Sequence, residues 1–148
     1  MSGTGVGYLR IGLPVDSVRS VCHVTRDTTR LVSEGQTARF LSVAFPDGPV
    51  EAEIVNGKVW RIEVTRPRFR TADSIGVRTP LSRLLSLNSA RGLTGEGQLF
   101  VVSPDHCGMS FRLSDNGSDA PSQRWDRSAL ARLPAATAVD KVLIFGCD

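Results

Sequence analysis

Histidine, cysteine and aromatic side chains are scarce in this sequence. Its 148 residues include two His, three Cys, two Trp, one Tyr and six Phe. Acid–base and nucleophilic catalysis draw heavily on His and Cys, so few catalytic sets are open to the chain. Hot spots of protein–protein binding favour Trp, Tyr and Arg, and of these only Arg is plentiful here. The composition therefore predicts a protein that is not an enzyme.

Long apolar segments and strong charge are also missing. No window approaches the roughly 20 apolar residues that cross a bilayer, and no apolar signal-peptide stretch follows Met1. The net charge is only +3, and the basic residues are spread evenly, which argues against nucleic acid and anionic lipid as partners. The length suits a single domain, 1–148. We therefore expect a soluble protein with no transmembrane segment; whether a signal peptide was removed stays open.

The three cysteines, Cys22, Cys107 and Cys147, form an odd set. Cys107 precedes one predicted strand and Cys147 ends another, so a disulfide between them is geometrically reasonable if those strands lie side by side. Such a bridge requires an oxidising compartment. The alternative is three small buried thiols in a reducing cytoplasm. The sequence leaves both readings open, with Cys107 and Cys147 as the disulfide candidates.

The clearest local signal is a β-hairpin over 50–64. Two runs of alternating apolar and polar residues flank Asn56-Gly57, a pair typical of tight hairpin turns. A two-residue loop would set Trp60 and Ile62 opposite acidic side chains. A three-residue loop with a bulge gives better cross-strand partners: Trp60 with Ala52, Ile62 with Val50, and Arg61 with Glu51. We therefore predict the longer loop, with Gly57 in the left-handed conformation and Trp60 facing the core.

The rest of the first half suggests a short helix followed by antiparallel strands. The helix is predicted over 13–21, because Pro14 suits a first turn and Val15, Val18 and Val21 make one apolar stripe. Strands are predicted over 28–33 and 37–45, ahead of the hairpin.

The second half follows the same order. Ile75-Gly76 precedes a helix predicted over 81–87, as Ile11-Gly12 precedes the first helix. Thr79 and Pro80 suit the N-cap and first helical positions. The remaining predictions are strands over 98–103, 109–113 and 141–145, a glycine-rich connection over 91–97, and a short helix over 128–133. This order predicts an internal duplication with halves 8–70 and 72–147, and chance similarity is the alternative.

The opening of each half is similar to that of a known group of folds. A strand ending in Ile-Gly, a short helix and then antiparallel strands resemble the β-lactamase-inhibitor-protein-like fold and the small outer-membrane lipoproteins of the barrel-assembly machinery. Those families open the helix with Gly-Met-x-x-x-x-Val; Gly12-Leu13 with Val18 is similar, and Gly76 begins a looser match. The resemblance covers most of the chain as architecture but only a few residues per half. It implies tandem repeats with a concave, aromatic-rich face and a cysteine pair in each repeat. The chain departs from the inhibitor family by lacking a cysteine pair in each repeat and an aromatic-rich surface, so inhibition is an expectation from fold alone.

Two adjacent pairs, Cys22-His23 and His106-Cys107, raise the question of zinc or thiol chemistry. Neighbours in an extended chain point to opposite faces, and the usual C-x₂₋₄-C or H-x₃₋₅-H spacing of zinc sites is missing. We therefore predict no metal site, and a Cys107 nucleophile activated by His106 fails on the same geometry. No glycine motif for phosphate or dinucleotide binding follows a strand, so we predict no cofactor. An alternative function stays open: a small hydrolase or ligand-binding domain with a site between the halves near His23 and His106.

Arginines supply the candidate binding residues. Arg66, Arg68 and Arg70 alternate, so an extended backbone would align them on one face, with Arg61 nearby. Such a row suits a phosphate, a carboxylate or an acidic partner. The favoured alternative is a solvated strand edge, where Pro67 and positive charge discourage sheet association.

Two polar motifs lie in a loop predicted over 114–123. The run 115–119 contains acidic residues but lacks the residue order and closing Glu of a calcium loop. Asn116-Gly117-Ser118 is a glycosylation sequon, which matters only in a eukaryotic secretory pathway. Neither motif predicts a site.

These patterns predict an α+β fold of two similar halves, each a short helix packed on an antiparallel meander. The leading functional prediction is a non-enzymatic protein- or peptide-binding or scaffold module of a bacterial envelope, periplasmic or secreted rather than cytoplasmic. Its partner is an unknown protein or peptide, and a purely structural accessory domain is a further alternative.

Overall fold

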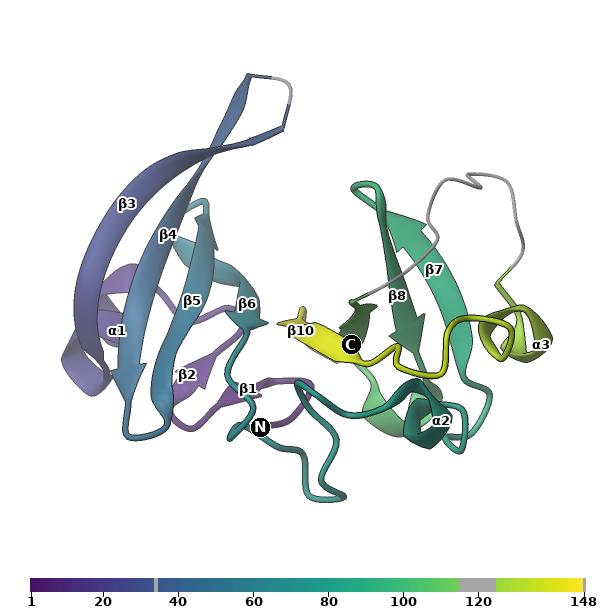
Figure 1. Cartoon of the computed structure of the whole chain (residues 1–148). Helices are drawn as coiled ribbons and strands as arrows, with labels where there is room; N and C mark the ends of the chain where they lie inside the picture. The colour runs from purple at the N-terminus through teal and green to yellow at the C-terminus, as the bar shows by residue number, and fades with distance from the viewer. Residues whose placement is uncertain (34, 115–124, 148) are drawn as a thin grey trace.

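The computed structural model describes residues 1–33, 35–114 and 125–147. It confirms an α+β chain dominated by antiparallel sheet (Figure 1). The first elements are β1 (Gly5–Val6), β2 (Leu9–Arg10), α1 (Val15–Val21), β3 (His23–Ser33), β4 (Gln36–Phe45), β5 (Gly48–Val55) and β6 (Lys58–Val64). The later elements are α2 (Leu81–Leu84), β7 (Arg91–Gly95), β8 (Gln98–Val102), the 3-10 turn η1 (Pro104–His106), β9 (Met109–Leu113), α3 (Arg127–Leu130) and β10 (Val139–Ile144). None of the helices in these ranges has the length and apolar character needed to span a bilayer.

The described strands form an eight-stranded antiparallel sheet in the order β3-β4-β5-β6-β10-β9-β8-β7. The last strand along the chain therefore lies in the middle of the sheet, where Val142 of β10 is opposite Val64 of β6 on one side and Phe111 of β9 on the other. Figure 1 shows the strands spreading away from β6 and β10, with the β3–β4 and β7–β8 hairpins at opposite ends. The short strands β1 and β2 pair separately.

The core lies on one face of this sheet. Alternate residues of the strands are buried there, as in the row formed by Ala52, Ile62 and Ile144, because residues opposite one another share a face. One cluster of buried side chains extends from Val6 to Ile144. The opposite face, which we call the polar face, carries the intervening residues, among them Glu51, Glu53, Arg61, Glu63, Ser110, Arg112 and Lys141.

The hairpin predicted over 50–64 forms, but its turn differs from the prediction. Asn56 and Gly57 alone make the turn, with φ values of 50° and 73°. The bulge lies instead within β6 at Trp60, where the register shifts by one residue. That shift sets Ala52 opposite Ile62, so an apolar pair still forms. Trp60 is 55% exposed, so the prediction that it faces the core is wrong, because a bulged residue leaves the alternation of the strand.

Both opening helices follow a proline. α1 starts after Pro14 and α2 after Pro80, and both prolines have extended ψ angles of 148°. The helices are shorter than the predicted ranges 13–21 and 81–87. Thr79 does not act as the N-cap; its hydroxyl instead accepts hydrogen bonds from the preceding segment.

The two edge strands extend beyond the sequence prediction. β3 begins at His23, ahead of the strand predicted over 28–33. The segment 91–97, predicted to be a connection, contains β7 and a two-residue turn in which Glu96 and Gly97 both have positive φ, 52° and 70°. The carbonyl of Trp125 accepts a hydrogen bond from Gly92 N at 2.7 Å and so covers part of the β7 edge.

Candidate functional site

The polar face is hollowed into a groove over β7–β10. The groove consists of two cavities, of about 580 and 290 Å³, that share Leu93, Ser110 and Phe145 as lining residues. The register of the strands explains the arrangement, because Leu93 lies opposite Phe100 and Ser110 lies opposite Leu143. Paired strands therefore form most of the wall of the smaller cavity, whereas η1 and the segments beside it form much of the wall of the larger one.

Large apolar side chains are exposed in this groove. Leu93 is 47% exposed and Phe145 is 39% exposed, and both line both cavities. Covering such a side chain fully contributes about 1.5–3 kcal/mol. Adjacent exposed apolar side chains in a hollow are typical of a surface that binds another molecule. The groove can therefore hold an apolar group.

Arg61 of β6 lines the smaller cavity and is 13% exposed. Its Nε lies 2.8 Å from Glu53 Oε2, and its Nη2 lies 3.3 Å from Glu63 Oε1. The Nε–Oε2 contact is too poorly aligned to count as a hydrogen bond, so it is an ion pair. Two carboxylates thus hold the guanidinium from the sheet side. Its Nη1 makes a looser contact, 3.6 Å from Glu96 Oε1.

The contact between Arg61 and Glu96 also indicates how the sheet is curved. Glu96 lies in the β7–β8 turn, and two strands, β9 and β10, separate β8 from β6. A side chain at this turn reaches β6 only if the sheet curls toward its polar face. The polar face is therefore concave, and the smaller cavity lies within that curl.

Arg91 lines the larger cavity. It lies two residues before Leu93 on β7, so the two side chains share a face. Arg91 is exposed, and no residue in the described ranges forms an ion pair or hydrogen bond with its side chain. Its guanidinium is therefore available to a bound anion.

The acidic side chains near the groove are, in contrast, paired. Glu63 Oε2 lies 2.9 Å from Lys141 Nζ, and Asp140 accepts hydrogen bonds of 2.7 and 3.1 Å from Arg112. Both pairs are partly buried. The negative charge of the polar face is thus largely balanced by its own cations.

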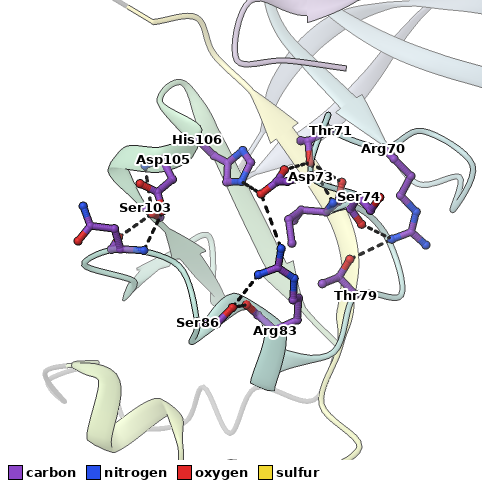
Figure 2. Close-up of polar contacts among 12 residues, drawn as sticks. Arg70, Thr71, Asp73, Ser74, Thr79, Arg83, Ser86, Ser103, Asp105 and His106 are labelled. Atoms are coloured by element: carbon purple, nitrogen blue, oxygen red, sulfur yellow. Dashed lines mark hydrogen bonds and ion pairs between the residues drawn. The ribbon is translucent and has the colours of Figure 1, made fainter.

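A second polar cluster surrounds Asp73, and one of its members, His106, also lines the larger cavity (Figure 2). Asp73 accepts hydrogen bonds from the Thr71 hydroxyl, at 2.6 Å, and from His106 Nε2, at 3.1 Å. The Thr71 hydroxyl is the main cause that holds the pKa of Asp73 below its ordinary value, against a smaller opposing effect of burial, and His106 lowers it further. The cluster ties the segment after β6 to the turn before β9.

The predicted disulfide is present. Cys107 and Cys147 are bridged, with a Cα–Cα distance of 5.4 Å, and they follow η1 and β10. The basis of the prediction is confirmed as well, because β9 and β10 pair side by side. Both cysteines are exposed. Cys22 is a free thiol, and burial raises its pKa, so it is not a reactive thiolate.

The arginine row predicted from the sequence does not form. A turn at 67–68 interrupts the extended backbone, and Arg66 and Arg68 are exposed on it. Arg70 instead donates hydrogen bonds to Ser74 O and to the Thr79 hydroxyl. Arg61 lies apart from these three, in β6. Of the four predicted binding residues, only Arg61 lines the groove.

The other sequence candidates are separated or not described. His23 starts edge strand β3, and His106 ends η1 beside β9, with β4, β5, β6 and β10 between β3 and β9 in the sheet. Within the described ranges, no three His, Cys, Asp or Glu residues are arranged to hold a metal ion. The acidic run 115–119 and the sequon at 116–118 lie outside the described residues.

Sequence reasoning missed most residues of the groove. The sequence pattern does not indicate Leu93, Glu96 or Phe145, because it places the first two in a connection and the third at the end of a strand. The run Gly95-Glu96-Gly97 was the available signal, since glycine-containing pairs mark hairpin turns. Recognition of that turn would have placed Leu93 on a strand and Glu96 at its tip.

Comparison with known proteins yields a likeness of fold. No protein-family model matches the chain, and no curated protein sequence matches it. Its structure is similar to the crystal structure of the uncharacterized protein YfeY from Escherichia coli, with a TM-score of 0.68 and 18% sequence identity over 98% of both chains. At this identity the likeness concerns the fold alone.

Proposed function

We propose that the chain is a non-enzymatic binding module that holds a segment of a partner protein in the groove on its concave polar face. The observation that carries this proposal is the pair of exposed side chains, Leu93 and Phe145, that line both cavities of the groove. Apolar surface of this kind is stabilised when a partner covers it. The open, elongated groove suits an extended peptide better than an enclosed small molecule.

Selection of random linear peptides on the full chain tests this function. Peptides that bind should shift the NMR signals of groove residues, and a Leu93→Ser, Phe145→Ser double variant should weaken their binding at least tenfold. Leu31→Ser is the matched control, because Leu31 is 68% exposed on β3, away from the groove. Thermal unfolding should show that all three proteins are folded. Peptide binding that survives the double variant contradicts the proposed site.

We further propose that the module works in a bacterial envelope, in the periplasm or outside the cell. The exposed disulfide between Cys107 and Cys147 supports this location, since such bridges persist in oxidising compartments. Alkylation of free thiols in freshly lysed native cells checks it. We expect one free thiol, that of Cys22, without reductant and three with reductant. Three thiols without reductant would indicate a reducing compartment.

We also propose that the chain arose by duplication of a half with one helix and four strands, over 8–70 and 72–147. The order β3-β4-β5-β6 followed by β10-β9-β8-β7 supports it, because the last strand of each half meets at the centre. Two isolated bridges have matching positions: Pro14 with Lys58, and Pro80 with Ala138. This likeness agrees with the resemblance to tandem-repeat inhibitor folds. Superposition of the halves in a crystal structure should align β3–β6 with β7–β10 in order; any other alignment would count against it.

A further inference from the structure

We infer that the groove selects an acidic, apolar peptide segment, and that Glu96 occupies the place of the peptide's carboxylate at Arg61 while the groove is empty. This inference rests on the proposed function and adds the chemistry of the partner. It is carried by the charges that line the two cavities and by the exposure of Glu96.

Glu96 is the acidic residue among those that line the two cavities. The residues lining the two cavities include two guanidinium groups, those of Arg61 and Arg91, and one carboxylate, that of Glu96. If Glu96 moves away, no carboxylate remains among the lining residues, and both Nη1 of Arg61 and the exposed guanidinium of Arg91 can take up an anion. A partner that fits this lining is therefore negatively charged.

Glu96 is held loosely enough to move. Its side chain is 74% exposed, and its described contact is the 3.6 Å approach to Arg61 Nη1. Exposed ion pairs of this length contribute about 1 kcal/mol or less. Arg61 stays in place without it, since Glu53 and Glu63 hold its Nε and Nη2. A peptide carboxylate can thus replace Glu96 at Nη1 without moving Arg61.

The apolar part of the partner follows from the middle of the groove. Leu93 and Phe145 line both cavities, so they lie between the cavity with Arg91 and the cavity with Arg61. An extended peptide presents every second side chain to one face. A segment with the pattern acidic-x-apolar-x-acidic therefore matches the groove, with its apolar side chain on Leu93 and Phe145 and its acids at the arginines.

Capped octapeptides test this chemistry directly. The probe is Gly-Asp-Thr-Leu-Thr-Asp-Thr-Gly, and its counterparts carry Asn or Lys in place of both Asp residues. NMR titration of the full chain should give the tightest binding for the Asp peptide, weaker binding for the Asn peptide and none for the Lys peptide. High salt should weaken the binding of the Asp peptide only, because the groove prefers that peptide through its charge.

Two variants assign the roles of the charged residues. Glu96→Gln should raise the affinity for the Asp peptide up to about fivefold, because it removes a competing carboxylate. The affinity for the Asn peptide should stay unchanged. Arg91→Gln should lower the affinity for the Asp peptide about threefold or more, again without effect on the affinity for the Asn peptide. Arg68→Gln is the matched control, since Arg68 is 79% exposed on the turn at 67–68, outside the groove.

The outcomes separate this inference from the proposed function. Equal binding of the Asp and Asn peptides, or an unchanged affinity in Glu96→Gln, overturns the inference. Selection of neutral or basic peptides that still require Leu93 and Phe145 also overturns it, while the groove remains a peptide site. If no selected peptide requires Leu93 and Phe145, the proposed function fails, and the inference fails with it.

Discussion

At the scale of the residue, replacement of Gly57 should lower the stability of the fold, because its backbone is left-handed. Its φ is 73°, and no atom lies within 4 Å of the place a Cβ would take. Gly57→Ala should therefore destabilise the fold by about 1 kcal/mol through backbone strain alone. Gly95→Ala is the control, because the backbone of Gly95 is not left-handed and a Cβ added there would lie 4.0 Å from the nearest atom, in the Phe100 ring. Urea unfolding compares the two; equal stabilities would mean that the turn relaxes.

Asp73 should make stability depend on pH in the acidic range. Its pKa in the fold is lowered, chiefly by the Thr71 hydroxyl, so its contribution is complete above the ordinary Asp pKa of about 3.9 and is lost as pH falls through the lowered value. Asp73→Asn should thus cost up to about 1 kcal/mol at pH 6, an upper limit because the carboxylate is 43% exposed and partly screened, and it should cost less at pH 2.5. Urea unfolding at both pH values measures the difference, and a cost that is the same at both would contradict this prediction.

At the scale of the element, the disulfide closes the segment that contains β9 and β10. Its cysteines are 40 residues apart in sequence. A loop of this length implies about 4 kcal/mol of stabilisation through restriction of the unfolded chain. Cys107→Ser with Cys147→Ser should lower the free energy of unfolding by about that amount, whereas Cys22→Ser should change it little. Reductant should destabilise the wild-type protein and leave the double variant unaffected, which is the check on the assignment.

Elements were predictable where the signal is local. Asn56-Gly57 marks its turn, and Pro14 and Pro80 mark the starts of two helices. The sequence pattern does not predict β7, because glycines weaken the alternation of apolar and polar residues in this strand. A Cβ on Gly92 would lie 2.5 Å from the Trp125 side chain, so this glycine is needed for a contact that the local sequence does not contain. The bulge at Trp60 was missed for a similar reason, since the alternation alone does not reveal an extra residue.

The groove was less predictable than the strands that build it. Arg61 was a candidate on charge, but its approach to Glu96 depends on the curl of the sheet. Curl arises from the twist of all the paired strands and has no local sequence signature. The row of Arg66, Arg68 and Arg70 failed because the turn at 67–68 breaks the assumed extended backbone.

At the scale of the whole molecule, the described core behaves as one cluster that includes residues of both β3–β6 and β7–β10. Both sets of strands should therefore unfold together. Reactivity of the half-buried Cys22 thiol reports the first set, and fluorescence of the buried Trp125, in a Trp60→Phe background, reports the second. Their urea midpoints should coincide. Exposure of Cys22 at a lower urea concentration than the fluorescence change would reveal independent halves.

The central position of β10 also has a consequence during synthesis of the protein on the ribosome. A ribosome finishes β6 at Val64 but supplies its neighbour only at Val139–Ile144. At translation rates of about 5–20 residues per second, β6 remains a bare edge for roughly 4–16 s. An unpaired strand edge can pair with another chain, so this edge of β6 favours aggregation until β10 pairs with it.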